Sequence, residues 1–150
     1  MKNTILICIC LAAAAVGCTP PAHLATPPGF VSLDDSDYDF RATNADGVVI
    51  AVRAMDNDPE GDLSFWSGVI DRRLRESYSA VDVRPVESAS EAEGVQIRYE
   101  TTHGGRLHRY WATIFVTPSR VYLVEAGGDA ELFDQHADEV EEAVLSVDLS

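Results

Sequence analysis

The chain has 150 residues, of which 46% are hydrophobic, and its 25 acidic and 11 basic residues give a formal net charge of −14. This length suits a single domain, and the hydrophobic fraction excludes an intrinsically disordered chain. Nucleic-acid binding is disfavoured, because an acidic chain without a basic stripe cannot displace the counterions of phosphates. The one long apolar run lies near the N-terminus, so no internal membrane span is expected.

The first eighteen residues have the pattern of a bacterial export signal. Lys2 supplies a positive start, and residues 5–16 form an apolar run that is too short to span a bilayer but suits a signal peptide. The run ends in Ala15-Val16-Gly17-Cys18, which resembles the lipobox of bacterial lipoproteins. That resemblance implies cleavage before Cys18 and a membrane anchor of fatty acyl chains, such as palmitate, on this residue.

The alternative is a plain secretory signal that is cleaved elsewhere. Cys8 and Cys10 would leave with the leader, so Cys18 would be the one cysteine of the mature protein. An exported protein with one leftover thiol needs an explanation, and lipidation provides it. Thr19 stands where many inner-membrane lipoproteins have Asp, so the resemblance implies the outer membrane of the cell envelope.

The segment after Cys18 is rich in proline. Residues 19–29 hold four of the seven prolines, and proline pairs favour an extended polyproline II conformation. We therefore expect a signal peptide over 1–17, a tether over 18–33 and a single domain over 34–150. The eleven residues 19–29 would hold this domain about 30 Å from the lipid. The acidic balance is read as a solvated surface, with an acidic patch for a cationic partner as the alternative.

The first part of the domain predicts a hairpin and a helix. Tyr38–Thr43 alternates polar and apolar residues, and the apolar run Val48–Met55 follows a turn at 44–47. The acidic stretch Asp34–Asp39 that leads into the hairpin is expected to be a solvated loop. An amphipathic helix is predicted over 63–77, with Asp62 as its N-cap.

The loop before this helix has acidic residues at alternate positions. Asp56, Asp58 and Glu60, followed by Gly61, imitate the start of a calcium-binding loop. The twelfth position is Ser67 rather than the bidentate Glu that such loops use. These three acidic residues are candidate Ca²⁺ ligands, and the alternative is an acidic loop with a helix cap. No other cofactor is expected.

The second half of the domain predicts four consecutive strands and a final helix. The strands are expected around Val81–Val86 and at Val95–Thr102, Leu107–Val116 and Val121–Ala126. Gly104-Gly105 is a strong hairpin signal. Gly127-Gly128 is expected to break the last strand, and Asp129 to cap the final helix. His136 falls on the apolar stripe of that helix and is expected to be a hydrogen-bonded core residue rather than a ligand.

Basic residues gather at the predicted Gly104-Gly105 hairpin. His103, Arg106, His108 and Arg109 form the one basic cluster of this acidic sequence that contains histidine. They are candidate residues for binding an anionic group or the acidic patch of a partner. The alternative is an exposed turn whose charges suppress aggregation at the edge of the sheet.

The element order β-β-α-β-β-β-β-α requires an antiparallel sheet with helices on its faces, an α+β fold. The stretches that carry this order resemble the Mog1/PsbP-like family: residues 40–55, the helix with Phe65 and Trp66, residues 99–124 and residues 133–147. The resemblance implies an α/β/α sandwich. Proteins of this kind are mostly binding or assembly factors rather than enzymes, and no catalytic residues carry over.

The sequence therefore predicts a lipid-anchored envelope lipoprotein that acts as a non-catalytic binding or assembly factor, with its partner not identified. No phosphate loop, dinucleotide fingerprint or zinc motif is present in the sequence. One alternative is a divalent-metal-dependent envelope hydrolase that uses the acidic loops. Another is a sensory input domain held at the membrane.

Overall fold

The structure is a computed structural model that describes residues 22–149, so the predicted leader and Cys18 lie outside the described residues. Its strands are β1 (Phe30–Ser32), β2 (Phe40–Asn44), β3 (Val49–Asp56), β4 (Ser79–Glu87), β5 (Glu93–His103), β6 (Arg106–Val116) and β7 (Arg120–Asp129). Its helices are α1 (Leu63–Leu74), α2 (Ala130–Gln135) and α3 (Ala137–Leu145). No helix within residues 22–149 is long and apolar enough to cross a membrane.

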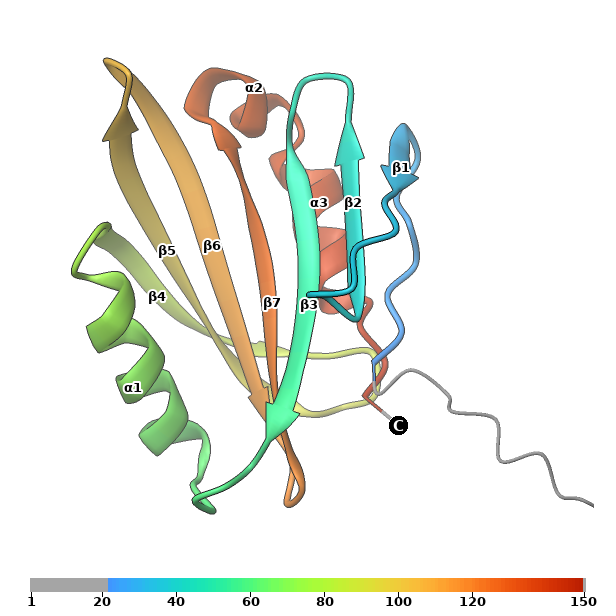
Figure 1. Ribbon diagram of the computed structural model, residues 1–150, viewed down its shortest axis with the longest axis vertical. Coiled ribbons are helices and arrows are strands. Elements are labelled where there is room, and N and C mark those ends of the chain that lie inside the picture. The colour runs from blue at the N-terminus through green and yellow to red at the C-terminus, as the bar shows by residue number, and fades with distance from the viewer. Residues whose placement is uncertain (1–21, 150) are drawn as a thin grey trace, which may run out of the picture.

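The seven strands form one antiparallel sheet in the order β1-β2-β3-β7-β6-β5-β4. Figure 1 shows α1 on one side of this sheet and α2 and α3 on the other. The predicted α+β fold, an antiparallel sheet between helices, is confirmed. Side chains alternate between the two faces of each strand, so the sheet has a separate hydrophobic core on each side.

The two cores draw on different helices. On the α1 side, Leu63, Trp66, Ile70 and Leu74 pack on buried residues of β5, β6 and β7, which is the stripe that helical spacing predicts. On the other side, Phe133 of α2 is fully buried and its ring meets Trp111 edge to face at 4.9 Å. The second core is the larger one, because it also collects the C-terminal helix and the N-terminal segment.

The predicted tether over 18–33 is wrong from Ala22 onward. Ala22 and Leu24 are each only 3% exposed and belong to the core on the α3 side. His23 forms an isolated bridge with Asp148, and β1 adds a short strand to the edge of β2. The segment packs because its apolar side chains are buried against elements that are distant in sequence.

The end of the chain also differs from the prediction. β7 continues through Gly127 and Gly128 to Asp129 instead of breaking at the glycine pair. A Cβ on Gly127 would lie 3.0 Å from the carbonyl oxygen of Arg109, so the close approach of β6 favours glycine there. Asp129 caps a helix as predicted, but that helix, α2, ends at Gln135, and after His136 a second one, α3, begins at Ala137.

Candidate binding cleft

The sheet face that carries α1 is only partly covered. The helix packs on β5 and β6, and beside it an open cleft of about 580 Å³ lies over β3, β7 and the ends of β5 and β6. We call this hollow the cleft. Val49 and Ala51 of β3 and Gly127 of β7 contribute small side chains or none to its lining. The cleft is therefore formed where the sheet has small residues and no helix above them.

Tyrosines separate the cleft from the helix. Tyr78, which follows α1, and Tyr110 of β6 both line the cleft, and their rings stack at 4.8 Å with an interplanar angle of 21°. Tyr99 of β5 lies behind them, fully buried, and its hydroxyl donates to Asp71 Oδ1 at 2.8 Å. Burial and the hydrogen bond to Asp71 raise the pKa of Tyr99 above its ordinary value.

A carboxylate that is mostly buried lies in the lining of the cleft. Glu125 of β7 accepts a 2.5 Å hydrogen bond from the Tyr110 hydroxyl, and its Oε2 lies 3.1 Å from Nε of Arg53. This ion pair lacks the alignment of a hydrogen bond, so Oε2 is buried without a hydrogen-bond donor. Arg53 in turn donates to the hydroxyl of Tyr38 at 2.5 Å. Burial and the charge of Glu125 raise the pKa of Tyr110 strongly, so its phenol stays a neutral donor.

The structure places three of the four predicted basic residues at the rim of the cleft. His103 and His108 line it, and their imidazole rings lie 6.1 Å apart; Arg109 also borders it, but its side chain turns to Asp134 of α2 on the opposite face. Arg106 does not line the cleft, because its Nε pairs with Asp129 at 2.8 Å. The four residues that the sequence grouped by charge therefore have different places: the two histidines lie at the rim of the cleft, whereas Arg106 forms an ion pair away from it.

The arginines at the cleft already have acidic partners within the chain. Arg109 forms two hydrogen bonds to Asp134 at 2.9 and 3.0 Å and a further ion pair with Glu100. The hydrogen bonds from Arg109 hold the pKa of Asp134 below its ordinary value. Arg41, on the opposite wall, pairs with Asp35 at 2.6 Å. Their positive charge is therefore largely compensated before any ligand arrives.

Sequence reasoning missed the tyrosines and Glu125. One signal pointed to Glu125: it is the one charged residue inside the apolar run Val121–Ala126. A carboxylate in a strand that is buried on both faces needs partners, and the structure supplies Tyr110 and Arg53. The tyrosines gave no such signal, because aromatic residues are ordinary in strands.

The loop that was predicted to bind calcium is held in place by the side-chain amide of Asn57. Asn57 Oδ1 accepts from the backbone N–H of Gly61 at 2.9 Å and from the Trp66 indole at 2.7 Å. Asp56 is exposed and lies 3.4 Å from Arg120. Among residues 22–149, no three His, Cys, Asp or Glu side chains are grouped so that they could hold a metal ion. Calcium binding by Asp56, Asp58 and Glu60 stays a prediction, without a preformed set of ligands.

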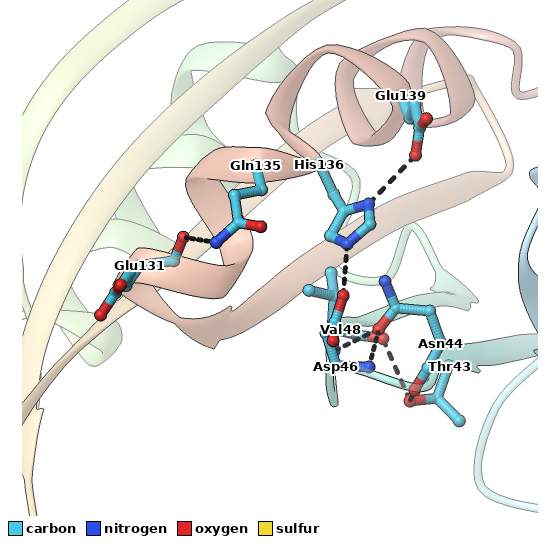
Figure 2. Close-up of polar contacts among 8 residues, drawn as sticks. All are labelled: Thr43, Asn44, Asp46, Val48, Glu131, Gln135, His136 and Glu139. Carbon is cyan, nitrogen blue, oxygen red and sulfur yellow. Dashed lines mark hydrogen bonds and ion pairs between the residues drawn. The ribbon is translucent and has the colours of Figure 1, made fainter.

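Behind the cleft, His136 joins the β2–β3 hairpin to the helices (Figure 2). Its Nε2 lies 2.7 Å from Asp46 Oδ2 and its Nδ1 lies 3.2 Å from Glu139 Oε2. The hydrogen bonds to Asp46 and Glu139 raise the pKa of His136. The expectation of a core residue is wrong, since the side chain is 25% exposed, although the expected hydrogen bonds are present.

The hairpin itself is ordered by Asn44. Its Oδ1 accepts from the backbone N–H groups of Asp46 at 3.1 Å and Val48 at 2.9 Å, as Figure 2 shows. Gly47 between them has a φ of +75° and lines the cleft. This turn therefore contributes to two features: Gly47 lines the edge of the cleft, and the Asp46 carboxylate pairs with His136.

Comparisons with known proteins show the fold. No family model matches the chain, and no curated protein matches it. Mycobacterium tuberculosis LpqN, described as involved in cell envelope biogenesis, is similar in structure with a TM-score of 0.65 and 13% identity, over 84% of this chain and 82% of that one. The cyanobacterial PsbP protein CyanoP of Synechocystis sp. PCC 6803 has a TM-score of 0.56 and 8% identity, over 93% and 99%.

A Pseudomonas aeruginosa protein of unknown function, PA94, has a TM-score of 0.55 and 8% identity, over 85% of this chain and 81% of that one. At such identities the likeness concerns the arrangement of helices and strands. The chain has the PsbP-like α+β fold, with an open cleft on the face that carries α1.

Proposed function

We propose that the protein is a lipid-anchored component of the cell envelope, and that its domain binds a partner molecule in the cleft without catalysing a reaction. The observation that carries this proposal is the cleft itself, a preformed hollow of about 580 Å³ with aromatic walls. Concave sites of this size are where proteins bind small ligands or single groups of a partner. The lipobox at Cys18 and the fold shared with an envelope-biogenesis protein support the location, and Thr19 supports the outer membrane.

The chemistry of the cleft supports binding rather than catalysis. The pair formed by Tyr110 and Glu125 is the arrangement nearest to a nucleophile with its base. A nucleophilic phenol needs a lowered pKa or a base that takes its proton in the reaction. Burial and Glu125 instead raise the pKa of Tyr110. The carboxylate of Glu125 is held by Tyr110 and Arg53, so it serves as a structural acceptor.

The anchor and the rim of the cleft lie at different ends of the molecule. Ala22, the first described residue, is buried and is four residues after Cys18, a span of at most about 14 Å. Its neighbour His23 pairs with Asp148 beside the C-terminus, at the bottom of Figure 1, whereas the β5–β6 hairpin with the histidines is at the top. Lipid on Cys18 would keep the end that carries Ala22 near the membrane. The rim of the cleft would then face the aqueous compartment.

Anchoring is tested by labelling cells with radioactive palmitate. Wild type and Cys10→Ala, a matched change within the leader, should both carry label and sediment with membranes. Cys18→Ala should lose the label and either stay uncleaved or appear in the soluble fraction. Label that persists in Cys18→Ala, or wild type without label, would contradict the proposed anchor.

Binding in the cleft is tested by site-specific crosslinking in the native envelope. A photoreactive phenylalanine in place of Tyr78, whose ring lines the cleft, should give one dominant crosslinked species. The same group in place of Val81, which is 55% exposed on the edge strand β4, serves as the matched control. Crosslinks of equal yield and pattern at both positions would show that the cleft does not select a partner.

A further inference from the structure

We infer that the domain sits directly on the headgroup layer of the membrane that holds its anchor, through the end formed by the first and last packed residues. We call this end the seat: residues 22–24, the turn 88–92 between β4 and β5, and residues 148–149. The inference rests on the proposed lipid at Cys18 and deepens it, because a lipid on a long tether would leave the domain free of the bilayer. It does not depend on what the cleft binds.

The first step concerns how the seat is held together. The backbone N–H of His23 donates to the carbonyl oxygen of Asp148 at 3.0 Å, and the N–H of Asp148 donates back to His23 at 2.8 Å. The N–H of Leu149 donates to Oγ of Ser90 at 3.2 Å. Ala22, which precedes His23, is 3% exposed and belongs to the core on the α3 side. The first and last packed segments and the β4–β5 turn therefore form one surface that is fixed to the core.

The second step compares two lengths. Residues 19–21 separate Cys18 from Ala22, so even a fully extended chain spans at most about 14 Å between them. The domain is much longer than this span. β5 runs through eleven residues from Glu93, beside the turn of the seat, to His103 at the rim of the cleft, which is about 35 Å at the rise of a strand. With lipid on Cys18, the bilayer surface must therefore pass close to the seat and far from the rim (Figure 1).

The third step concerns the chemistry of the contact. The exposed residues of the seat are small or polar, namely His23, Ala89, Ser90, Glu91 and Asp148. The large hydrophobic residues that are exposed within residues 22–149 all lie outside the seat. The seat thus suits the polar headgroup layer and has no side chain that would enter the hydrocarbon. An acidic domain is not drawn to anionic lipids by charge either, so the short covalent span is what holds it on the membrane.

The test measures how close single sites lie to the headgroups in the lipidated protein. Ala89→Cys in the seat, Val31→Cys on β1 and Leu107→Cys near the rim place one thiol each at exposed positions, and the thiol is labelled with the fluorophore NBD. The protein is reconstituted in vesicles of phosphatidylcholine and phosphatidylethanolamine, with and without a lipid that carries a nitroxide quencher on its headgroup. The Ala89 site should lose most of its fluorescence to the quencher, and the Val31 and Leu107 sites should lose much less.

Two insertions tie the quenching to the short span. About twenty Gly and Ser residues inserted after Thr19 give a flexible segment with a root-mean-square reach of about 25 Å. This insertion precedes every packed residue, so circular dichroism should be unchanged, whereas quenching at Ala89 should fall to the level of Leu107. The same insertion between Gly104 and Gly105 lengthens the tip of the β5–β6 hairpin, a change that surface loops tolerate. It leaves the span to Cys18 unchanged and should preserve the quenching at Ala89.

The outcomes separate this inference from the proposed anchor. In protein that carries palmitate and floats with the vesicles, equal quenching at Ala89 and Leu107 would overturn the seat and leave the anchor intact. Stronger quenching at Val31 than at Ala89 would show that the domain lies on its β1 edge, and would overturn the seat as well. Quenching at Ala89 that survives the insertion after Thr19 would refute the role of the short span. Protein without palmitate that stays off the vesicles would instead contradict the anchor itself.

Discussion

His136 offers a direct test of how the β2–β3 hairpin is held against the helices. Replacing it with glutamine removes a titratable ring that lies 2.7 Å from Asp46 and 3.2 Å from Glu139. Because these partners raise the pKa of His136 in the folded state, the protonated ring stabilises the fold. This contribution is complete below the unfolded pKa, near 6.5, and is lost as the pH rises through the higher folded value.

The size of the effect follows from exposure. The side chain of His136 is 25% exposed, that of Asp46 44% and that of Glu139 56%. Ion pairs in such settings contribute about 0.2–1 kcal/mol each, so the two together should stabilise by about 1 kcal/mol at pH 5.5. The helix dipoles add little, because His136 follows α2, where a cation is favourable, and precedes α3, where it is not. Above pH 8 a few tenths of a kcal/mol should remain from one neutral hydrogen bond.

The assay is urea unfolding of wild type and His136→Gln, followed by circular dichroism at pH 5.5 and pH 8.5. The loss of stability in the variant should be about 1 kcal/mol at the lower pH and a few tenths at the higher. Combining it with Asp46→Asn should give a coupling energy that is largest at pH 5.5 and falls to a few tenths of a kcal/mol or less at pH 8.5. Glu139→Gln tests the second partner of His136 in the same way. Its control is Asp138→Asn, which removes a neighbouring acidic residue in the first turn of α3. An equal loss at both pH values would refute the ion-pair reasoning and assign His136 a packing role.

Three further changes test the core, the cleft and the metal prediction. Tyr110→Phe removes the hydrogen-bond donor of Glu125, whose side chain is 18% exposed, and should cost about 1–3 kcal/mol in urea unfolding; unchanged stability would mean that this carboxylate is solvated. Phe133→Ala should cost about 3–5 kcal/mol because the ring is fully buried, and Trp66→Ala only about 2–3 kcal/mol because its ring is partly exposed; the reverse order would contradict the assignment of the two cores. EDTA or millimolar CaCl₂ should leave the melting temperature unchanged, whereas a rise with Ca²⁺ concentration would show a binding site.

Local signals in the sequence located most elements because the structure follows them. Asp62 was expected to cap the first helix, and its side chain accepts from the backbone N–H of Phe65 at 2.8 Å. Gly104 and Gly105 were expected to form a hairpin, and both have positive φ in the turn between β5 and β6. These features depend on a few neighbouring residues, so periodicity and turn chemistry are sufficient to predict them.

The errors arose where distant residues determine the outcome. Ala22 and Leu24 look like part of a proline-rich tail, and they are buried only because the C-terminal helix and β2 lie beside them. Gly127 looks like a strand breaker, and it continues the strand because β6 approaches to a distance that a side chain would obstruct. In neither case does the neighbouring sequence contain the partner, so local propensity alone gives the wrong answer.

The candidate site shows the same limit for charge. The sequence grouped His103, Arg106, His108 and Arg109 because they are neighbours along one hairpin, which predicts where they lie but not with what they pair. Asp129 and Asp134, which take the two arginines, come from the end of β7 and from α2. A positive cluster in the sequence therefore becomes, in the structure, a pair of histidines at the rim and two arginines that already have acidic partners.

This pairing also bears on the net charge of −14. Eight arginines form ion pairs within the described residues, namely Arg41, Arg53, Arg75, Arg84, Arg98, Arg106, Arg109 and Arg120. The acidic residues that exceed them include Asp138, Glu139 and Glu142, which are exposed on α3, on the side of the sheet opposite the cleft. We expect this surplus to form a solvated surface that keeps an acidic protein dispersed.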